Sequence, residues 1–429
     1  MTQSGQIPQA RQGPWCGLRS PQPPVATRLT QLPPYLFAKI DAAKREARAA
    51  GKNLVDLGVG DPDQPTPAFI IRAMAKAIRD PANHRYALDQ GMPELREAIA
   101  GWYRRRFGVT LDPQREILPL IGSKEGIAHL PFAFLNPGDR ALIPDPCYPP
   151  YRTCTILAGG HPVSLPLAED HDFLPDPAQI RREAKTRTKL LYVNYPNNPT
   201  GAVASLAFFR DLVKLAQRHG FLVAHDAAYS ELAFDGTRPP SFLQVPGAKE
   251  VGLEFHSLSK TFNMTGWRIG WACGNAQAVA ALGKVKSNID SGIFQAIQVA
   301  GMAALRAPAS TMAPLLATYR RRRDLLVEGL QRHGWPAKPQ RATFYVWMRI
   351  PEGMTSAETA QRLLEQAGVV VTPGNGFGTA GEGYLRMAIT VPEPRIREAV
   401  RRVARLRLWP HHLSGCFRQH PKDGPKGRR

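Results

Sequence analysis

The sequence predicts an α/β protein with a three-layer α/β/α large domain, built on a mostly parallel sheet, and a smaller α+β domain. Its 429 residues exceed what a single hydrophobic core usually holds. Short apolar runs alternate with segments of helical period, which is typical of parallel sheets. Polar residues follow several of these runs, where the carboxyl ends of strands gather ligand groups.

The expected elements of the large domain alternate along the chain. The apolar residues at 118–121 predict a strand, and the segment from Ser123 to Leu135 predicts the helix that follows it. Ser205 is a favourable N-cap for an amphipathic helix that we expect to end near Arg218. Further strands are expected at 141–144, 189–194, 221–226 and 251–256.

The elements expected in the smaller domain are three helices and two strands. The helices are predicted at 314–333, 357–367 and 395–408, and the strands at 343–350 and 384–389. The expected division of the chain has five parts: a disordered Pro-rich extension (1–30), an N-terminal arm that joins the small domain (31–64), a large domain (65–312), a small C-terminal domain (313–409) and a basic flexible tail (410–429).

Composition and charge exclude several classes of protein. No apolar run reaches the roughly 20 residues that span a bilayer, and the first thirty residues lack the apolar core of a secretory signal. The five cysteines are scattered without a CxxC pair, so we expect no metal site and a reduced, cytoplasmic protein. The net charge is +21, and residues 395–429 carry eleven basic and two acidic residues. A basic tail can bind nucleic acid or membrane, but without interleaved aromatic residues we favour a solvated surface and expect neither partner.

The most informative segment is the run HSLSKTFNMTGWRIG at 256–270. It places Lys260 directly after an apolar strand, and a lysine amine can hold an aldehyde cofactor as a Schiff base. The hydroxyls of Ser257 and Ser259 and the guanidinium of Arg268 are suited to anchoring a phosphate. The alternative is that Lys260 is an ordinary solvated lysine of a loop.

Residues distant from this run provide further candidate contacts. Asp226 ends a predicted buried strand, where a carboxylate needs a cationic partner such as a pyridinium nitrogen; a helix-capping aspartate is the alternative. Tyr229 and Asn198 could donate hydrogen bonds to an oxygen on the same ring, although Asn198 also suits plain turn chemistry. Tyr148 could stack on such a ring, or equally lie in the core.

Two further segments suggest binding of anions. Ser123 and Lys124 lie where a predicted strand turns into a helix, and the amides of a helix N-terminus favour phosphate. Arg386 lies in an alternating strand, which suggests recognition of a carboxylate; a surface ion pair is the alternative.

Taken together, these motifs resemble those of the fold-type I pyridoxal-phosphate aminotransferases of class I/II, over residues 30–408. Within that class the sequence is most similar to the LL-diaminopimelate aminotransferase group. The resemblance rests on the segments LPPYLF (32–37), LGVGDP (57–62), GSKEGIAH (122–129), NPTG (198–201), DAAY (226–229) and FHSLSK (255–260).

The resemblance implies pyridoxal phosphate as the cofactor and a homodimer with shared active sites. It implies ping-pong transfer of an amino group between an amino acid and a 2-oxo acid, with LL-diaminopimelate and 2-oxoglutarate, in lysine biosynthesis, as the favoured pair. Catalytic roles fall on Lys260, Asp226 and Tyr229. The implied cofactor contacts are Ser123, Lys124, Tyr148, Asn198, Asp226, Tyr229, Ser257, Ser259, Lys260, Arg268 and, from the partner subunit, Tyr86. The implied substrate contacts are Tyr35, Gly60, Lys124, Asp89, Asn198, Asn288 and Arg386.

The distal end of the substrate leaves alternatives open. In part of the family an acidic residue reads the distal ammonium from the position of Asp89, and aspartate keeps that charge with a shorter reach. Residues 281–301 contain no arginine for a distal carboxylate, and we expect Lys284 and Lys286 to be helix-surface charges. An aminotransferase for alanine, aspartate or aromatic substrates and a β-lyase on the same cofactor remain alternatives. A cofactor-binding transcription regulator is disfavoured, because residues 1–30 are too short for a helix-turn-helix domain.

Overall fold

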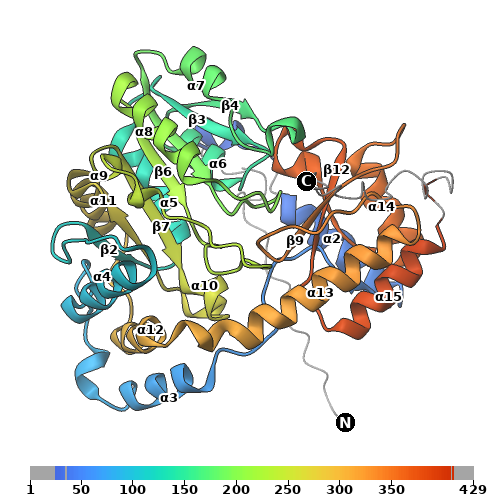
Figure 1. Cartoon of the computed structure of the whole chain (residues 1–429), viewed down its shortest axis with the longest axis horizontal. Coiled ribbons are helices and arrows are strands. Elements are labelled where there is room, and N and C mark those ends of the chain that lie inside the picture. Colours follow the sequence, from blue (N-terminus) through green and yellow to red (C-terminus); the bar gives the residue numbers. More distant parts are fainter. Residues whose placement is uncertain (1–24, 34–35, 407, 410–429) are drawn as a thin grey trace, which may run out of the picture.

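The computed structural model describes residues 25–33, 36–406 and 408–409, except for the side chains of residues 36–39 (Figure 1). The predicted tail at 410–429, most of the predicted extension and the predicted substrate contact Tyr35 lie outside the described residues. Residues Thr27–Thr30, at the end of the predicted extension, form a single helical turn, α1. No helix in the described part of the chain is long and apolar enough to cross a membrane.

The core of the large domain is a seven-stranded sheet with the order β2-β8-β7-β6-β5-β3-β4. Neighbouring strands are parallel from β7 to β4, and β8 runs antiparallel to both β7 and β2. The strands are β2 (Ile117–Leu120), β3 (Arg140–Asp145), β4 (His161–Pro166), β5 (Thr188–Asn194), β6 (Leu222–Asp226), β7 (Gly252–Ser257) and β8 (Gly270–Gly274).

Helices cover both faces of this sheet because its strands bury alternate residues on opposite sides (Figure 1). Leu190 and Tyr192 of β5 pack in one apolar cluster with α5, α6 and α11, whereas Leu191 and Val193 pack in another with α4, α7, α8 and α12. The helices are α3 (Ala68–Ala77), α4 (Pro93–Phe107), α5 (Ser123–Phe134), α6 (Pro150–Leu157), α7 (Pro177–Glu183), α8 (Leu206–His219), α9 (Ala248–Val251), α10 (Leu258–Thr261), α11 (Ala276–Ile289) and α12 (Gln295–Arg306).

The remaining elements form a second, smaller body with its own apolar core (Figure 1). Its antiparallel sheet has the order β11-β12-β9, and β1 pairs in parallel with β10. The strands are β1 (Val55–Asp56), β9 (Tyr345–Arg349), β10 (Val369–Val370), β11 (Thr372–Pro373) and β12 (Tyr384–Ala388). The helices are α2 (Leu36–Ala49), α13 (Ala313–Gln331), α14 (Ser356–Ala367) and α15 (Glu393–Ala404).

The predicted fold class is confirmed, and the twelve helices and strands named from the sequence form close to the expected positions. Long α13 extends from the large body into the small one in Figure 1. The β1–β10 pair joins the segment 31–64 to the small body, as the sequence suggests. The exact domain boundaries remain predictions.

Candidate active site

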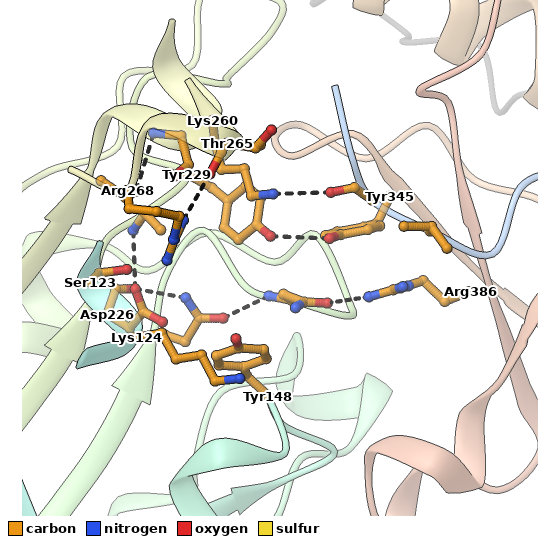
Figure 2. Close-up of a pocket in the computed structure, with 17 residues that line it drawn as sticks. Ser123, Lys124, Tyr148, Asp226, Tyr229, Lys260, Thr265, Arg268, Tyr345 and Arg386 are labelled. Carbon is orange, nitrogen blue, oxygen red and sulfur yellow. Dashed lines mark hydrogen bonds between the residues drawn. The ribbon is translucent and has the colours of Figure 1, made fainter. Parts of the chain in front are cut away.

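A cavity of about 340 Å³ opens at the carboxyl ends of β5, β6 and β7, against the small sheet (Figure 2). In Figure 2, Arg268 and Ser123 lie at one end and Arg386 at the other, with Lys260 and Tyr148 on opposite sides between them. The cavity is lined by Val59, Gly60, Ser123, Lys124, Tyr148, Asn194, Asn198, Asp226, Ala228, Tyr229, Ser257, Ser259, Lys260, Thr265, Arg268, Tyr345 and Arg386.

Lys260 points into the middle of this cavity from α10, the single turn that follows β7. Its Nζ donates a hydrogen bond to the backbone oxygen of Gly60 over 3.0 Å and lies 5.5 Å from the centre of the Phe344 ring. Burial lowers the pKa of Lys260 to about 8, and the positive charges of Arg386 and Arg268 act in the same direction. A large fraction of this amine is therefore neutral near pH 8, as a nucleophile or base requires.

Asp226 is a buried carboxylate at the end of β6. Its Oδ2 accepts a hydrogen bond from the Tyr151 hydroxyl over 2.8 Å, and its Oδ1 accepts one from the Ala228 amide over 3.3 Å. Burial raises the pKa of Asp226, and the bond from Tyr151 opposes that rise. Among the described residues no cation lies within ion-pair distance of this carboxylate, so a cationic ring nitrogen would supply the missing partner.

Tyr229 and Tyr345 join the two bodies of the molecule across the cavity. Their hydroxyl oxygens are 3.1 Å apart and share a hydrogen bond. The Tyr345 hydroxyl also closes over the backbone at Gly60, where a β-carbon would lie only 2.1 Å from it. Only glycine fits there, which explains why the backbone oxygen of Gly60 can approach Lys260.

Arg386 lies at the end of the cavity opposite Arg268. Its side chain is 1% exposed, and its Nη1 donates to Asn198 Oδ1 over 2.9 Å while its Nη2 donates to the backbone oxygen of Gly58 over 2.8 Å. The guanidinium also lies 4.1 Å from the centre of the Tyr345 ring. These contacts hold the guanidinium in place, and its planar group of donors is suited to a carboxylate.

The opposite end is built from two helix N-termini and Arg268. Gly122 precedes α5 with a φ of 76°, a conformation that favours glycine, and a β-carbon there would lie 2.3 Å from Arg268 Nη2. Ser257 caps α10 by accepting the Ser259 amide over 3.1 Å. Arg268 makes no ion pair with any residue that the structure describes. Free amides, hydroxyls and a guanidinium together suit a phosphate.

The donor set fits pyridoxal phosphate at three points on its small ring. Lys260 can take the aldehyde, Asp226 can face the ring nitrogen, and the cradle at Gly122, Ser257 and Arg268 can take the phosphate. Arg386 then remains at the far end for the carboxylate of a substrate. The fold and the cavity thus define a protein that handles amino or 2-oxo acids on a phosphorylated aldehyde cofactor.

Comparisons with known proteins agree with this class. Residues 52–403 match the family model described as aminotransferase class I and II. The chain is 57% identical over 378 residues to the LL-diaminopimelate aminotransferase of Desulforudis audaxviator, covering 88% of this chain and 96% of that protein. It is 54% identical over 383 residues to the protein of the same name from Nitratidesulfovibrio vulgaris, covering 89% and 99%.

Solved structures of aminotransferases share the fold. Substrate-bound BacF from Bacillus subtilis superposes with a TM-score of 0.85 at 37% identity, covering 90% of this chain and 98% of that one. Aspartate aminotransferase from Thermus thermophilus with maleate gives 0.84 at 35% identity, covering 90% and 100%. The chain belongs to the class I and II aminotransferase family, and it is a pyridoxal-phosphate-dependent aminotransferase.

Twelve of the predicted site residues line the cavity of the single chain, but three lie elsewhere. Tyr86 is 95% exposed, Asp89 lines a separate surface groove, and the Asn288 amide donates to the backbone oxygen of Lys284. None of the three lines the cavity of its own chain.

Sequence reasoning missed five residues of the cavity wall and one charge. Tyr345 lies in a predicted strand, but the alternation of that strand does not indicate that its hydroxyl reaches the cavity. The expectation that Lys286 is a surface charge was wrong. Lys286 is fully buried, because its Nζ pairs with Glu125 of α5 over 2.6 Å. The unpredicted wall residues are Val59, Asn194, Ala228, Thr265 and Tyr345.

Proposed function

We propose that this aminotransferase takes LL-diaminopimelate as its amino donor and 2-oxoglutarate as its acceptor, in lysine biosynthesis. The observation that carries the proposal is the identity of 57% and 54% to two proteins named LL-diaminopimelate aminotransferase, over nearly their whole lengths. The buried Arg386 supports it, because both substrates carry an α-carboxylate for that guanidinium.

Within the proposed reaction, Lys260 holds the cofactor and then moves the proton at the α-carbon of the substrate. Its lowered pKa supports this role, since the amine must be neutral to accept that proton. Bound pyridoxal phosphate supplies an electron sink, and Asp226 strengthens it by keeping the ring nitrogen protonated. In this proposal Tyr229 and Asn198 donate hydrogen bonds to the 3-oxygen of the ring, and Tyr148 stacks on its face; all three line the cavity.

The remaining roles concern anchoring. The phosphate shell consists of Ser123, Lys124, Ser257, Ser259 and Arg268 in this proposal. Arg386 binds the substrate α-carboxylate, helped by Asn198 and the backbone of Gly60, with Lys124 and Tyr35 as further contacts predicted from the sequence.

We also propose a homodimer, in which Tyr86, Asp89 and Asn288 complete the active site of the partner. Two observations support it: these residues do not reach the cavity of their own chain, and exposed apolar side chains accompany them. Leu88 is 69% exposed and Ile289 56% exposed, which favours burial against a second copy.

We further propose a cytoplasmic location. The three cysteines in the described part of the chain, Cys147, Cys154 and Cys273, are free and buried, which is consistent with a reducing compartment.

An amino-donor screen tests the proposed function. The purified holoenzyme is incubated with 2-oxoglutarate and LL-diaminopimelate, alanine, aspartate or phenylalanine, and glutamate formation is measured. We expect the highest kcat/KM with LL-diaminopimelate. Glutamate from alanine or an aromatic donor but not from diaminopimelate would overturn the substrate assignment and leave the aminotransferase class intact. Release of ammonia without an acceptor would indicate a β-lyase instead.

Asp89→Asn tests how the distal ammonium of the donor is read. Losing the carboxylate should raise KM for LL-diaminopimelate roughly tenfold, because a charge-assisted contact contributes about 1.5–3 kcal/mol. KM for 2-oxoglutarate provides the internal control, since that substrate has no ammonium. Equal increases for both substrates would argue against a role for Asp89 in donor recognition.

A further inference from the structure

A buried charged cluster lies in the sheet beneath the cavity, outside the residues assigned to the reaction. Its centre is Glu254 of β7, whose carboxylate is fully buried. Each of its two oxygens accepts several hydrogen bonds, all of them between 2.8 and 2.9 Å. The donors are Tyr103 Oη, Ser241 Oγ and His256 Nε2 to one oxygen, and the Phe242 amide and His225 Nδ1 to the other.

This arrangement fixes the charge of two groups. With both imidazoles donating, Glu254 accepts five hydrogen bonds, which favours its ionised form, and burial would be prohibitive for that charge without them. The same contacts hold the pKa of Glu254 well below its usual range. His225 is held between two acceptors, because its Nδ1 faces Glu254 over 2.9 Å and its Nε2 faces the backbone oxygen of Tyr195 over 3.0 Å. An imidazole can satisfy two acceptors only when both nitrogens carry protons, so His225 is an imidazolium.

The position of His225 connects three parts of the active site. His225 directly precedes Asp226 on β6 and pairs in register with Glu254 on β7. Glu254 in turn lies three residues before Ser257 on the same strand. Its Nε2 holds Tyr195, which begins the loop leading to Asn198. Asn194, at the end of β5, also holds this loop in place. Its side-chain amide donates to the backbone oxygen of Asp226 over 2.6 Å, and its Oδ1 accepts a hydrogen bond from the backbone amide of Asn198 over 2.7 Å.

We propose that the buried ion pair of Glu254 and His225 is a positioning device that fixes the loop of Asn198 against the strand of Asp226. Asn198 in turn accepts a hydrogen bond from Arg386, so the device sets the geometry of both the cofactor and the carboxylate ends of the cavity. Burial raises the pKa of Asp226, and the charge of His225 opposes that rise. The expected effect on the reaction rests on the proposed function, in which Asn198 and Asp226 contact the cofactor. The inferred charge of His225 does not depend on that proposal.

Nitrogen-15 NMR of histidine-labelled protein tests the charge directly. The titratable groups of the cluster besides His225 are Tyr103, Glu254 and His256, and the Cys273 thiol contacts both Tyr103 and the backbone oxygen of Glu254. The rings of Phe209 and Phe242 pack beside His225. Because His225 faces two acceptors, we expect the nitrogen-15 signals of both of its ring nitrogens to be those of N–H groups. A His225 with only one protonated nitrogen in the folded wild-type protein would overturn the proposal, whatever the activity shows.

Glu254→Gln and Tyr103→Phe form a matched pair for the second part of the proposal. Both remove one partner of the cluster, but only the first removes the charge that holds the imidazolium. In Glu254→Gln we expect a neutral His225, a dissociation constant for pyridoxal phosphate raised roughly tenfold, and a raised KM for 2-oxoglutarate. In Tyr103→Phe we expect a protonated His225 and nearly unchanged constants.

Two outcomes would contradict the positioning role. One is a neutral His225 in Glu254→Gln together with wild-type cofactor affinity and KM. The other is an equal loss in both variants, which would indicate a general effect of core packing. A wild-type protein that keeps a protonated His225 but fails the donor screen would refute the substrate assignment and leave the charge of His225 standing.

Discussion

At the scale of single residues, the site depends on groups whose charge is controlled by burial. Lys260 is the clearest case, because the same burial that aims its amine into the cavity also lowers its pKa to about 8. Asp226 and Arg386 are buried side chains of opposite charge that line the same cavity. Buried charges of this kind need partners of the opposite charge, and ligand groups can supply them.

The lowered pKa of Lys260 predicts how the stability of the cofactor-free protein depends on pH. The ordinary pKa is 10.5, so between pH 8 and 10.5 the unfolded chain keeps a proton that the folded chain has lost. As the pH rises through this window, the free energy of unfolding should therefore increase by roughly 3 kcal/mol. Below pH 8 the folded protein bears the full cost of burying the charged amine. Denaturant unfolding of the wild-type protein and of Lys260→Met, each at pH 7.5 and 10, measures it.

Lys260→Met cannot show this gain, because methionine carries no charge to desolvate. Its stability advantage over the wild-type protein should thus be large at pH 7.5 and small at pH 10. An advantage that is the same at both values would mean that Lys260 titrates normally in the folded protein.

Arg386→Lys tests the carboxylate end. Lysine keeps the charge but cannot form the planar two-point contact that a guanidinium makes, so we expect KM for both substrates to rise roughly 10- to 100-fold. Arg349→Lys on the neighbouring strand β9 is a suitable control, because Arg349 is exposed and pairs with Glu169. If Arg386→Lys changed KM no more than this control does, Arg386 would not be the carboxylate site.

The sequence predicted those site residues that belong to short local patterns. Lys260 follows an apolar strand and precedes Arg268 by eight residues, and Asp226 ends another strand, so spacing alone brought both to one edge of the sheet. Tyr345 could not be found in this way. Tyr345 reaches the cavity only because the small sheet packs against the large one, and a pattern within one strand does not encode that contact.

At the scale of elements, the phosphate end depends on a tight turn between β2 and α5. Gly122→Ala should weaken cofactor binding by tenfold or more, because the added β-carbon would displace Arg268 and strain a backbone with φ of 76°. Gly108→Ala is the matched control: its φ is 69°, but nothing lies within 4 Å of the added carbon. Titration with pyridoxal phosphate followed by absorbance gives both dissociation constants.

Both variants should lose about 1 kcal/mol of stability from the backbone strain alone. Only Gly122→Ala should also lose cofactor affinity. Equal affinities in the two variants would remove this turn from the phosphate site.

Helices and strands were predictable where one face of each is apolar, and individual buried charges were not. Helix α8 begins after the N-cap Ser205, whose Oγ accepts the Phe208 amide, as the sequence suggests. Lys286 shows the limit: the chain around it gives no sign that Glu125 of a distant helix will meet it. Contacts between elements decide such residues, and they depend on tertiary packing.

At the scale of the whole molecule, the proposed homodimer predicts that two inactive variants can restore each other. Lys260→Ala lacks the amine proposed to hold the cofactor, and a double variant Tyr86→Ala/Asp89→Ala lacks the residues proposed to serve the partner. Mixed dimers would contain one complete site, so a refolded equal mixture should regain about a quarter of wild-type activity, by random pairing of subunits.

The control mixture combines Lys260→Ala with Arg386→Ala. Both residues line the cavity of the same chain, so no mixed dimer of these variants has a complete site. Activity should stay absent in this mixture. Recovery here, or none in the first mixture, would contradict shared active sites.

Covalent mapping of the cofactor tests the central claim most directly. The protein is loaded with pyridoxal phosphate, the link between aldehyde and amine is reduced with borohydride, and the digest is analysed by mass spectrometry. The site geometry predicts the cofactor on the peptide that contains Lys260, because this amine is buried, aimed into the cavity and has a pKa of about 8. Modification of another lysine, or of none, would contradict the account.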